Sequence, residues 1–128
     1  MREILFRGKR VDNGEWVEGL PFGSIYGGSF NGAICAIRQT VEKYGDIHEV
    51  VIETVGEYTG LTDKNGKRIF EGDIVQGEAE EACGIVEWQQ SEGRYLISVR
   101  NGYDWLFLDD DTWTIISNKW DNPELLED

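Results

Sequence analysis

The stretch TVGEYTGLTDKNGKRIFEGDIV, residues 54–75, holds the densest run of turn signals in the chain. DKNG at 63–66 predicts a tight turn between TGL and KRIF, because Asn-Gly readily adopts the positive φ angles that such turns require. EGD at 71–73 predicts a second sharp turn. The two turns should set Ile69, Phe70, Ile74 and Val75 into the core. The residues expected to define this corner are Thr59, Gly60, Asp63, Asn65, Gly66, Glu71, Gly72 and Asp73.

Two ligand-binding motifs nearly match this stretch, and each fails at a defining position. An EF-hand loop centred on DKNG would begin at Leu61 and end at Gly72, where calcium ligation requires acidic residues. A Walker phosphate loop needs four residues between its glycines, whereas five separate Gly60 from Gly66. We therefore interpret the stretch as the structural hinge between the two halves of the fold, and it predicts no catalytic residue, cofactor or metal.

Short segments with alternating or β-branched residues flank the stretch on both sides and predict strands. Residues 2–10 and 15–20 should pair through DNG at 12–14 as a type I′ hairpin, with Trp16 and Leu20 near the core. Further strands are expected at 33–39, 84–89, 95–100, 105–108 and 112–117 and within 47–55. The inward pairs should be Val86 with Trp88, Ile97 with Val99, Trp105 with Phe107, and Trp113 with Ile115.

The bulk composition agrees with a small, mainly β fold. A chain of 128 residues with sixteen glycines and two prolines suits one β-rich domain, 1–128, with two possible subdomains at 1–58 and 59–128. Helical structure should be limited to short turns, such as one beginning at Asn122-Pro123. Cys35 and Cys83 should be buried free thiols. No run of apolar residues reaches the length of a membrane span, so we expect a cytoplasmic protein.

The charge is strongly acidic and uneven. The formal net charge is −13, of which residues 77–128 contribute −10 and residues 1–76 contribute −3. Nucleic-acid affinity comes largely from neutralised phosphates, so ordinary DNA or RNA binding is disfavoured, as is docking on anionic lipid. One alternative is an acidic mimic of nucleic acid that occupies a host DNA-binding protein. Another is a metal-dependent hydrolase with an acidic site, whose candidate residues are Asp109, Asp110, Asp111, Glu78, Glu80 and Glu81.

The segment PFGSIYGGSFNG, residues 21–32, predicts an aromatic loop over the core. Phe22, Tyr26 and Phe30 are its candidate partner-binding residues. The sequence holds no catalytic constellation, so the first hypothesis is a non-enzymatic module that binds another protein through this loop or the acidic loops. Unprotected edge strands in such a domain also make a homo-oligomer a possibility.

Three segments give the chain its resemblance to a known family. They are REILFRGKR with NGEWVEG near the start, the stretch 54–75, and ISNKWDNPELLE at 116–127. Together they resemble the YopX family of phage and prophage proteins, although a Gly-Asn pair is usual in that family where this chain has Ser117-Asn118. The resemblance implies a β-rich fold with an SH3-like barrel in the later half and a phage or prophage origin. It implies no biochemical activity and no catalytic residue.

Overall fold

The computed structural model describes residues 4–21, 34–38, 47–77, 83–99 and 104–126. In these residues strands predominate, and helical structure is limited to short 3₁₀ turns, which confirms the mainly β prediction. The elements are β1 (Phe6–Lys9), β2 (Trp16–Pro21), β3 (Ile34–Arg38), β4 (Ile47–Val51), η1 (Ile52–Thr54), β5 (Gly56–Thr62), β6 (Arg68–Phe70), β7 (Asp73–Gln76), β8 (Cys83–Gln89), β9 (Arg94–Val99), β10 (Asp104–Phe107), β11 (Thr114–Asn118) and η3 (Pro123–Leu126).

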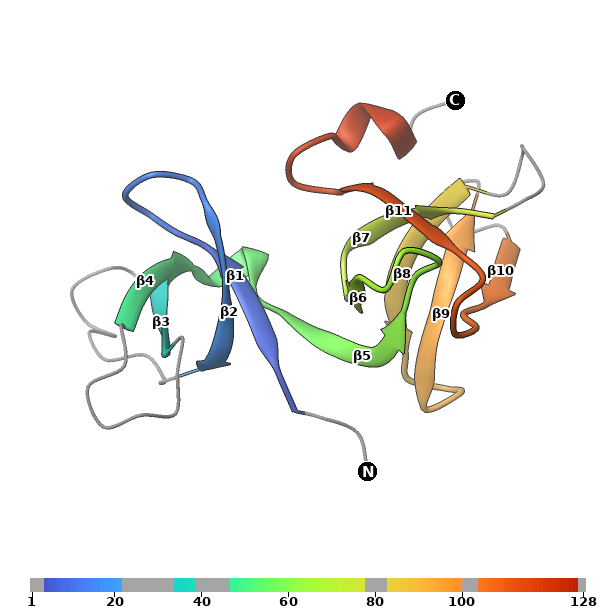
Figure 1. The fold of residues 1–128 in the computed structure, drawn as a ribbon, viewed down its shortest axis with the longest axis horizontal. Coiled ribbons are helices and arrows are strands. Elements are labelled where there is room, and N and C mark those ends of the chain that lie inside the picture. The colour runs from blue at the N-terminus through green and yellow to red at the C-terminus, as the bar shows by residue number, and fades with distance from the viewer. Residues whose placement is uncertain (1–3, 22–33, 39–46, 78–82, 100–103, 127–128) are drawn as a thin grey trace. The chain divides into compact units, whose positions relative to one another are not determined.

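The chain divides into two compact units, Met1–Tyr58 and Thr59–Asp128, hereafter unit 1 and unit 2. Hydrogen bonding orders six strands as β4-β3-β2-β1-β5-β6 and the other five as β10-β9-β8-β7-β11 (Figure 1). The boundary between the units falls within β5. No described helical segment is both long enough and apolar enough to cross a membrane.

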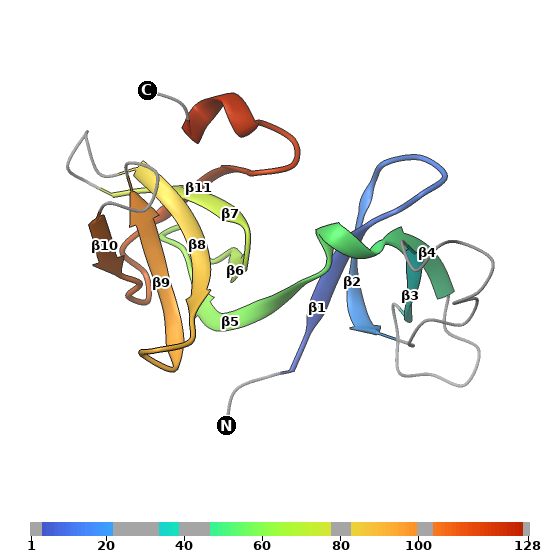
Figure 2. The ribbon, with the colours of Figure 1, turned by 180° about the vertical axis from the view of Figure 1, so that it is seen from behind.

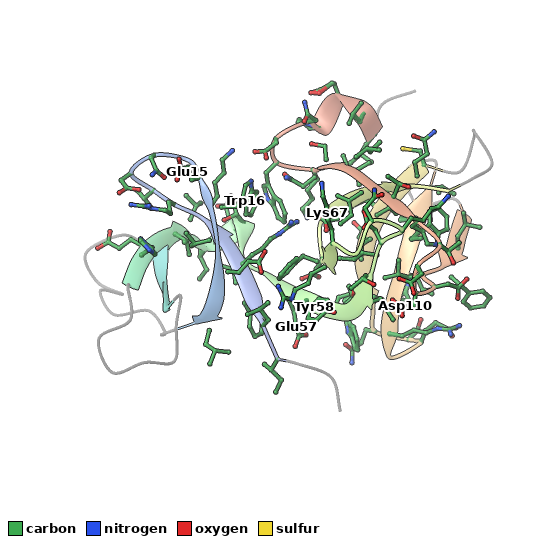
Figure 3. All side chains as sticks on the ribbon, in the orientation of Figure 1. Glu15, Trp16, Glu57, Tyr58, Lys67 and Asp110 are labelled. Atoms are coloured by element: carbon green, nitrogen blue, oxygen red, sulfur yellow. The ribbon has the colours of Figure 1, made fainter. Side chains whose placement is uncertain are left out.

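Unit 1 is built on the predicted hairpin, but its turn differs from the prediction. β1 pairs with β2 so that Lys9 faces Trp16, and Figure 3 shows Trp16 where β2 begins. The connecting loop is longer than a two-residue type I′ turn, because Arg10 N donates to Glu15 O and Gly14 N donates to Arg10 O. Of the Asn-Gly pair, only Gly14 has a positive φ angle, of 72°.

The edge of β1 that does not pair with β2 contacts the chain segment that runs from β4 through η1 into β5. Arg10 forms a bridge with Val50, and further along Phe6 faces Glu57. Between these pairs η1 interrupts the ladder, and there the Thr54 hydroxyl accepts a hydrogen bond of 2.9 Å from Lys9 N. β1 is therefore bonded on both edges, to β2 on one side and to the segment from β4 to β5 on the other.

The small core of unit 1 uses the opposite face of β2 from the one predicted. Val17 and Val50 are buried and Val55 packs against them. Trp16 is half-buried, whereas Leu20 is 40% exposed, so the prediction for Leu20 is wrong. Side chains alternate along a strand, and burying Val17 turns its even-numbered neighbours outward. Trp16 instead packs against cations, with Arg7 Cζ 4.7 Å from its ring centroid.

Unit 2, whose strands β10-β9-β8-β7-β11 are seen from behind in Figure 2, holds the larger core. Ile69, Phe70, Ile74 and Val75 are all fully or almost fully buried, as predicted from the two turns. The main cluster contains Ile69, Val75, Val86, Ile97, Val99 and Trp113, with Tyr95, Leu106, Leu108 and Ile115 packed around it. The inward pairs Ile97 with Val99 and Trp113 with Ile115 are thereby confirmed.

Two predicted inward aromatic residues lie at the surface instead. Trp88 shares its face with buried Val86 but is 43% exposed, because it lies at the end of β8 beyond the core. Phe107 is 61% exposed, because β10 pairs it with Leu96 and so places it on the face opposite Ile97. The side chain of Trp105 lies outside the described residues.

Close approach of strands in unit 2 depends on Gly84, which is buried in β8. A Cβ atom at this position would lie 2.4 Å from the carbonyl oxygen of Ser98 and 2.8 Å from Cγ2 of Ile97. Such distances are shorter than packed atoms tolerate. Glycine therefore allows β8 and β9 to pair at this point.

Candidate functional site

The first turn of the central stretch is organised by the carboxylate of Asp63, which is fully buried. Its Oδ1 accepts hydrogen bonds from Asn65 N at 2.8 Å and Lys67 N at 2.9 Å, and these close the turn locally. Its Oδ2 accepts a hydrogen bond of 3.1 Å from Ile115 N in β11. A further bond runs from Lys64 N to Trp113 O at 2.8 Å. Asp63 thus connects its own turn to a strand that lies about fifty residues later in the chain.

The environment of Asp63 keeps its carboxyl group ionised. Burial by itself raises the pKa of this group, but the N–H donors of Ile115, Lys67 and Asn65 outweigh it, with help from the charge of the Lys67 side chain. The net effect is a pKa below the ordinary aspartate value. All three hydrogen-bond donors belong to the backbone, so this carboxylate acts as a structural connector and is not arranged to exchange a proton with a ligand.

The second turn, Glu71-Gly72 between β6 and β7, receives the C-terminal segment. Gly72 has a φ of 92°; its N–H donates to Val86 O at 2.8 Å, and its carbonyl accepts from Lys119 N at 3.0 Å. Asp73 Oδ2, which is buried, accepts from Phe70 N at 2.8 Å. Two of the three segments that suggested the family, 54–75 and 116–127, are therefore in direct contact.

The C-terminal segment is shaped by its own side chains. Asn118 Oδ1 accepts hydrogen bonds from the backbone N–H groups of Trp120 and Asp121, at 3.1 and 2.9 Å. The hydroxyl of Ser117 donates to Asn122 Oδ1. A 3₁₀ turn follows at Pro123–Leu126, close to the predicted position.

Thr59 and Gly60 shape β5 where it runs beside β6 in the same sheet. The buried hydroxyl of Thr59 donates to Ile69 O at 2.8 Å and accepts from Leu61 N at 3.2 Å. Gly60 has a φ of 91°, a value that side-chain-bearing residues rarely adopt. Asn65 and Gly66 are exposed in the first turn, and the φ of Gly66 is 81°. The described contacts and φ angles of Thr59, Gly60, Asp63, Gly66, Gly72 and Asp73 thus serve backbone geometry.

The acidic loop proposed as a metal site is bonded to this same stretch. Asp110, labelled in Figure 3, accepts hydrogen bonds from Thr62 N at 2.9 Å and has its Oδ1 3.2 Å from the Thr62 hydroxyl. Asp111 has a φ of 58° and donates from its N to Thr62 O at 3.0 Å. Glu78, Glu80 and Glu81 lie outside the described residues. Within the described ranges, no group of three or more His, Cys, Asp or Glu side chains is placed to hold a metal ion.

The other predicted interaction residues, Phe22, Tyr26 and Phe30, also lie outside the described residues. Cys83 is a free, half-buried thiol whose pKa is raised by burial, which makes the reactive thiolate scarcer. The side chain of Cys35 lies outside the described residues.

The surface that sequence reasoning missed lies at the end of the β8–β9 hairpin. It consists of Trp88, Arg94, Tyr95 and Phe107, and we call it the hairpin aromatic surface. The rings of Trp88 and Tyr95 meet edge to face, with centroids 5.0 Å apart and planes at 71°. The guanidinium carbon of Arg94 lies 4.3 Å from the ring centroid of Phe107. The two pairs stand on opposite faces of the sheet at the same end, because side chains alternate along β9.

Each exposed aromatic ring on this surface is held by a neighbour. Trp88 Nε1 donates to Gln90 Oε1 at 2.8 Å, which fixes the orientation of the indole. Arg94, which covers Phe107, also lies 3.6 Å from the Glu92 carboxylate in the hairpin turn. Alternation in WLFL and GIVEWQ predicted burial for both aromatic residues. For Trp88 the available signal was its distance from the middle of the strand, since a core this small does not extend to the ends of its sheet. For Phe107 the sequence held no such signal, because its face follows from the pairing of Phe107 with Leu96.

Comparison with known proteins bears on the fold and on the family. The crystal structure of protein EF1440 from Enterococcus faecalis is similar to this chain, with a TM-score of 0.57 and 23% sequence identity. That alignment covers 99% of this chain and 100% of the other, and at this identity it concerns the fold alone. No curated protein sequence matches the chain. The family model described as YopX protein matches residues 5–127, so the chain belongs to the YopX protein family.

Proposed function

We propose that this protein is a non-enzymatic interaction module that binds another protein through the hairpin aromatic surface of unit 2. The observation that carries the proposal is the exposure of Trp88 and Phe107, at 43% and 61%, on β8 and β10, the two strands that flank β9. Tryptophan, tyrosine and arginine are the residue types most enriched in the energetic centres of protein interfaces. Here these three types occur together with an exposed phenylalanine.

Rigidity supports the same proposal. Side chains that are already ordered lose little conformational freedom on binding, and that loss otherwise opposes association by about 0.5–1.5 kcal/mol for each side chain. Trp88 is held by Gln90 and Tyr95, and Phe107 is held beneath Arg94. A partner would therefore meet a surface that is largely organised before it arrives.

The test is capture of a partner from a lysate of the bacterium in which the gene occurs, with the tagged full chain as bait. We expect a defined protein to be retained by the wild type and lost with Trp88→Ala and with Phe107→Ala. Ile116→Ala is the matched control, because Ile116 is an exposed apolar residue on β11 with 40% exposure. Retention of the same protein by both aromatic variants would refute the proposal.

Two further arms of this experiment address the other interaction surfaces. A variant with Phe22, Tyr26 and Phe30 all changed to alanine tests the aromatic loop 21–32, which remains a prediction. Addition of excess duplex DNA tests mimicry of nucleic acid. A captured DNA-binding protein that duplex DNA releases would favour the acidic-mimic alternative over the module proposed here.

A further inference from the structure

The hairpin aromatic surface already shows how it accommodates a cation. Arg94 Cζ lies 4.3 Å from the Phe107 ring centroid, within the range of about 6 Å over which the negative face of an aromatic ring attracts a positive charge. Both side chains of this contact are exposed to solvent. This end of the sheet is therefore compatible with a guanidinium lying over an aromatic ring.

Trp88 offers a stronger binding site of the same kind. The indole ring is the best aromatic acceptor for a cation, and the Trp88 ring is held by Gln90 and Tyr95 while 43% of the residue stays exposed. Those two residues are its partners within the described chain, and neither is cationic. Its indole thus has exposed area for a cation supplied by another molecule.

The surrounding charge would draw such a cation in. Residues 59–128 contain six Lys or Arg against sixteen Asp or Glu, a net charge of −10. Glu87 adjoins Trp88 along β8 on the other face of the sheet, and Glu92 lies in the turn that joins β8 to β9. A negative electrostatic field raises the association rate of cationic partners and lowers the association rate of anionic ones.

From these contacts we infer that the surface binds an arginine-rich segment of the partner protein, with one guanidinium over the ring of Trp88. The inference rests on the proposed function and specifies the chemistry of its partner. Arginine suits the site better than lysine, because its planar, weakly hydrated guanidinium stacks on aromatic faces. The net negative charge of unit 2 would attract the other arginines of the segment.

The test uses the full chain labelled with ¹⁵N and two synthetic peptides, Gly-Arg-Gly-Arg-Gly-Arg-Gly and the same peptide with citrulline in place of arginine. Citrulline keeps the shape of arginine and removes its charge. The indole N–H signal of Trp88 is identified by its disappearance in Trp88→Phe. We expect the arginine peptide to shift this signal saturably, and the citrulline peptide to bind at least about fivefold more weakly.

Variants test whether the ring of Trp88 itself contributes to binding of the arginine peptide. Trp88→Ala should weaken arginine-peptide binding by about three- to fivefold, the equivalent of a cation–π contact at an exposed site, and Trp88→Phe should weaken it less. Ile116→Ala should bind like the wild type. Dispersed amide signals in each variant show that it is folded. Equal binding of the citrulline peptide, or shifts centred on another tryptophan, would overturn the inference.

The remaining outcomes distinguish this inference from the proposed function. If the arginine peptide does not bind while partner capture still requires Trp88, the inference fails and the interaction module stands. If capture is insensitive to both Trp88 and Phe107, the proposed function fails. Sedimentation of the chain alone that shows a dimer, lost in Trp88→Ala, would identify the occupant as a second copy and would also overturn the inference.

Discussion

The ring of Trp120 occupies the space that a side chain at Gly72 would need. A Cβ atom built on Gly72 would lie 2.4 Å from both Cη2 and Cζ3 of Trp120. The backbone of Gly72 is fixed at the same time by hydrogen bonds with Val86 and Lys119. The turn at Gly72 can therefore pack against Trp120 of the C-terminal segment only because residue 72 has no side chain.

Gly72→Ala should therefore destabilise the protein strongly. The left-handed backbone costs a non-glycine residue about 1–2 kcal/mol, and displacing a packed ring adds about 1–3 kcal/mol. We expect the free energy of unfolding, measured with urea, to fall by about 3 kcal/mol. Gly66→Ala is the matched control: its φ is 81° but no atom lies within 4 Å of the added Cβ, so it should lose about 1–2 kcal/mol. Equal losses would show that Trp120 is not the cause.

The contact between Gly72 and Trp120 also predicts non-additivity. In Gly72→Ala, further removal of the ring by Trp120→Ala relieves the clash, so the double variant should be more stable than the sum of the two single losses implies. Residues in direct contact couple by about 0.5–3 kcal/mol in such cycles. Additive losses in urea unfolding would contradict the geometry.

Gly84→Ala should be as damaging as Gly72→Ala, for a different reason. The added Cβ would lie 2.4 Å from the backbone oxygen of Ser98, which is part of the β9 strand and cannot rotate away. We expect a loss of about 2–4 kcal/mol, combining overpacking with a strained strand pairing. Gly93→Ala, in the hairpin turn with a φ of 66° and no atom within 4 Å, is the comparison and should lose less. A thermal melt of both variants measures the difference.

Asp63 makes stability depend on pH. Its pKa is lowered in the folded protein, so its contribution is fully present above the unfolded value of about 3.9 and is lost as pH falls through the lower folded value. Asp63→Asn should lose about 2 kcal/mol near neutral pH, because the amide lacks the charge and places a donor near another N–H. The gap between the two proteins should narrow below about pH 4.

The control for this pH dependence is Asp109→Asn, which alters an exposed carboxylate of the acidic loop. Urea unfolding at several pH values between about 2.5 and 7 measures all three proteins, a range that spans the ordinary pKa of aspartate. A constant gap between wild type and Asp63→Asn over that range would show that Asp63 is not the group responsible.

Calorimetric titration with Mg²⁺, Mn²⁺ and Ca²⁺ should show no binding tighter than millimolar. Hard cations need several free carboxylate oxygens, whereas Asp110 Oδ1 already accepts a hydrogen bond from Thr62 N, and Asp111 Oδ1 lies 3.0 Å from the Thr62 hydroxyl. Saturable heat at micromolar metal that vanishes in Asp110→Asn would instead support the metal-dependent hydrolase.

Much of the fold could be predicted from local sequence, but the exposure of side chains at its surface could not. The turns at 63–66 and 71–73 and the strands around them were predictable, because turn residues and side-chain alternation act over a few neighbours. The exposure of Trp88 and Phe107 was not predictable from the sequence. Burial of Trp88 depends on how far the core extends along β8, and burial of Phe107 depends on its pairing with Leu96 in β9. The DNG turn was placed correctly, but its length was decided by the pairing of Arg10 with Glu15.

The sequence by itself determined the β class, the family and the positions of the principal turns, since these reside in short motifs whose backbone preferences are intrinsic. Tertiary structure alone decided what the motif residues do. Asp63 bonds to Ile115 and Gly72 receives Trp120 across about fifty residues of chain, and no local pattern encodes which distant backbone will arrive. The same holds for the hairpin aromatic surface, whose Trp88–Tyr95 and Arg94–Phe107 contacts each depend on strand pairing.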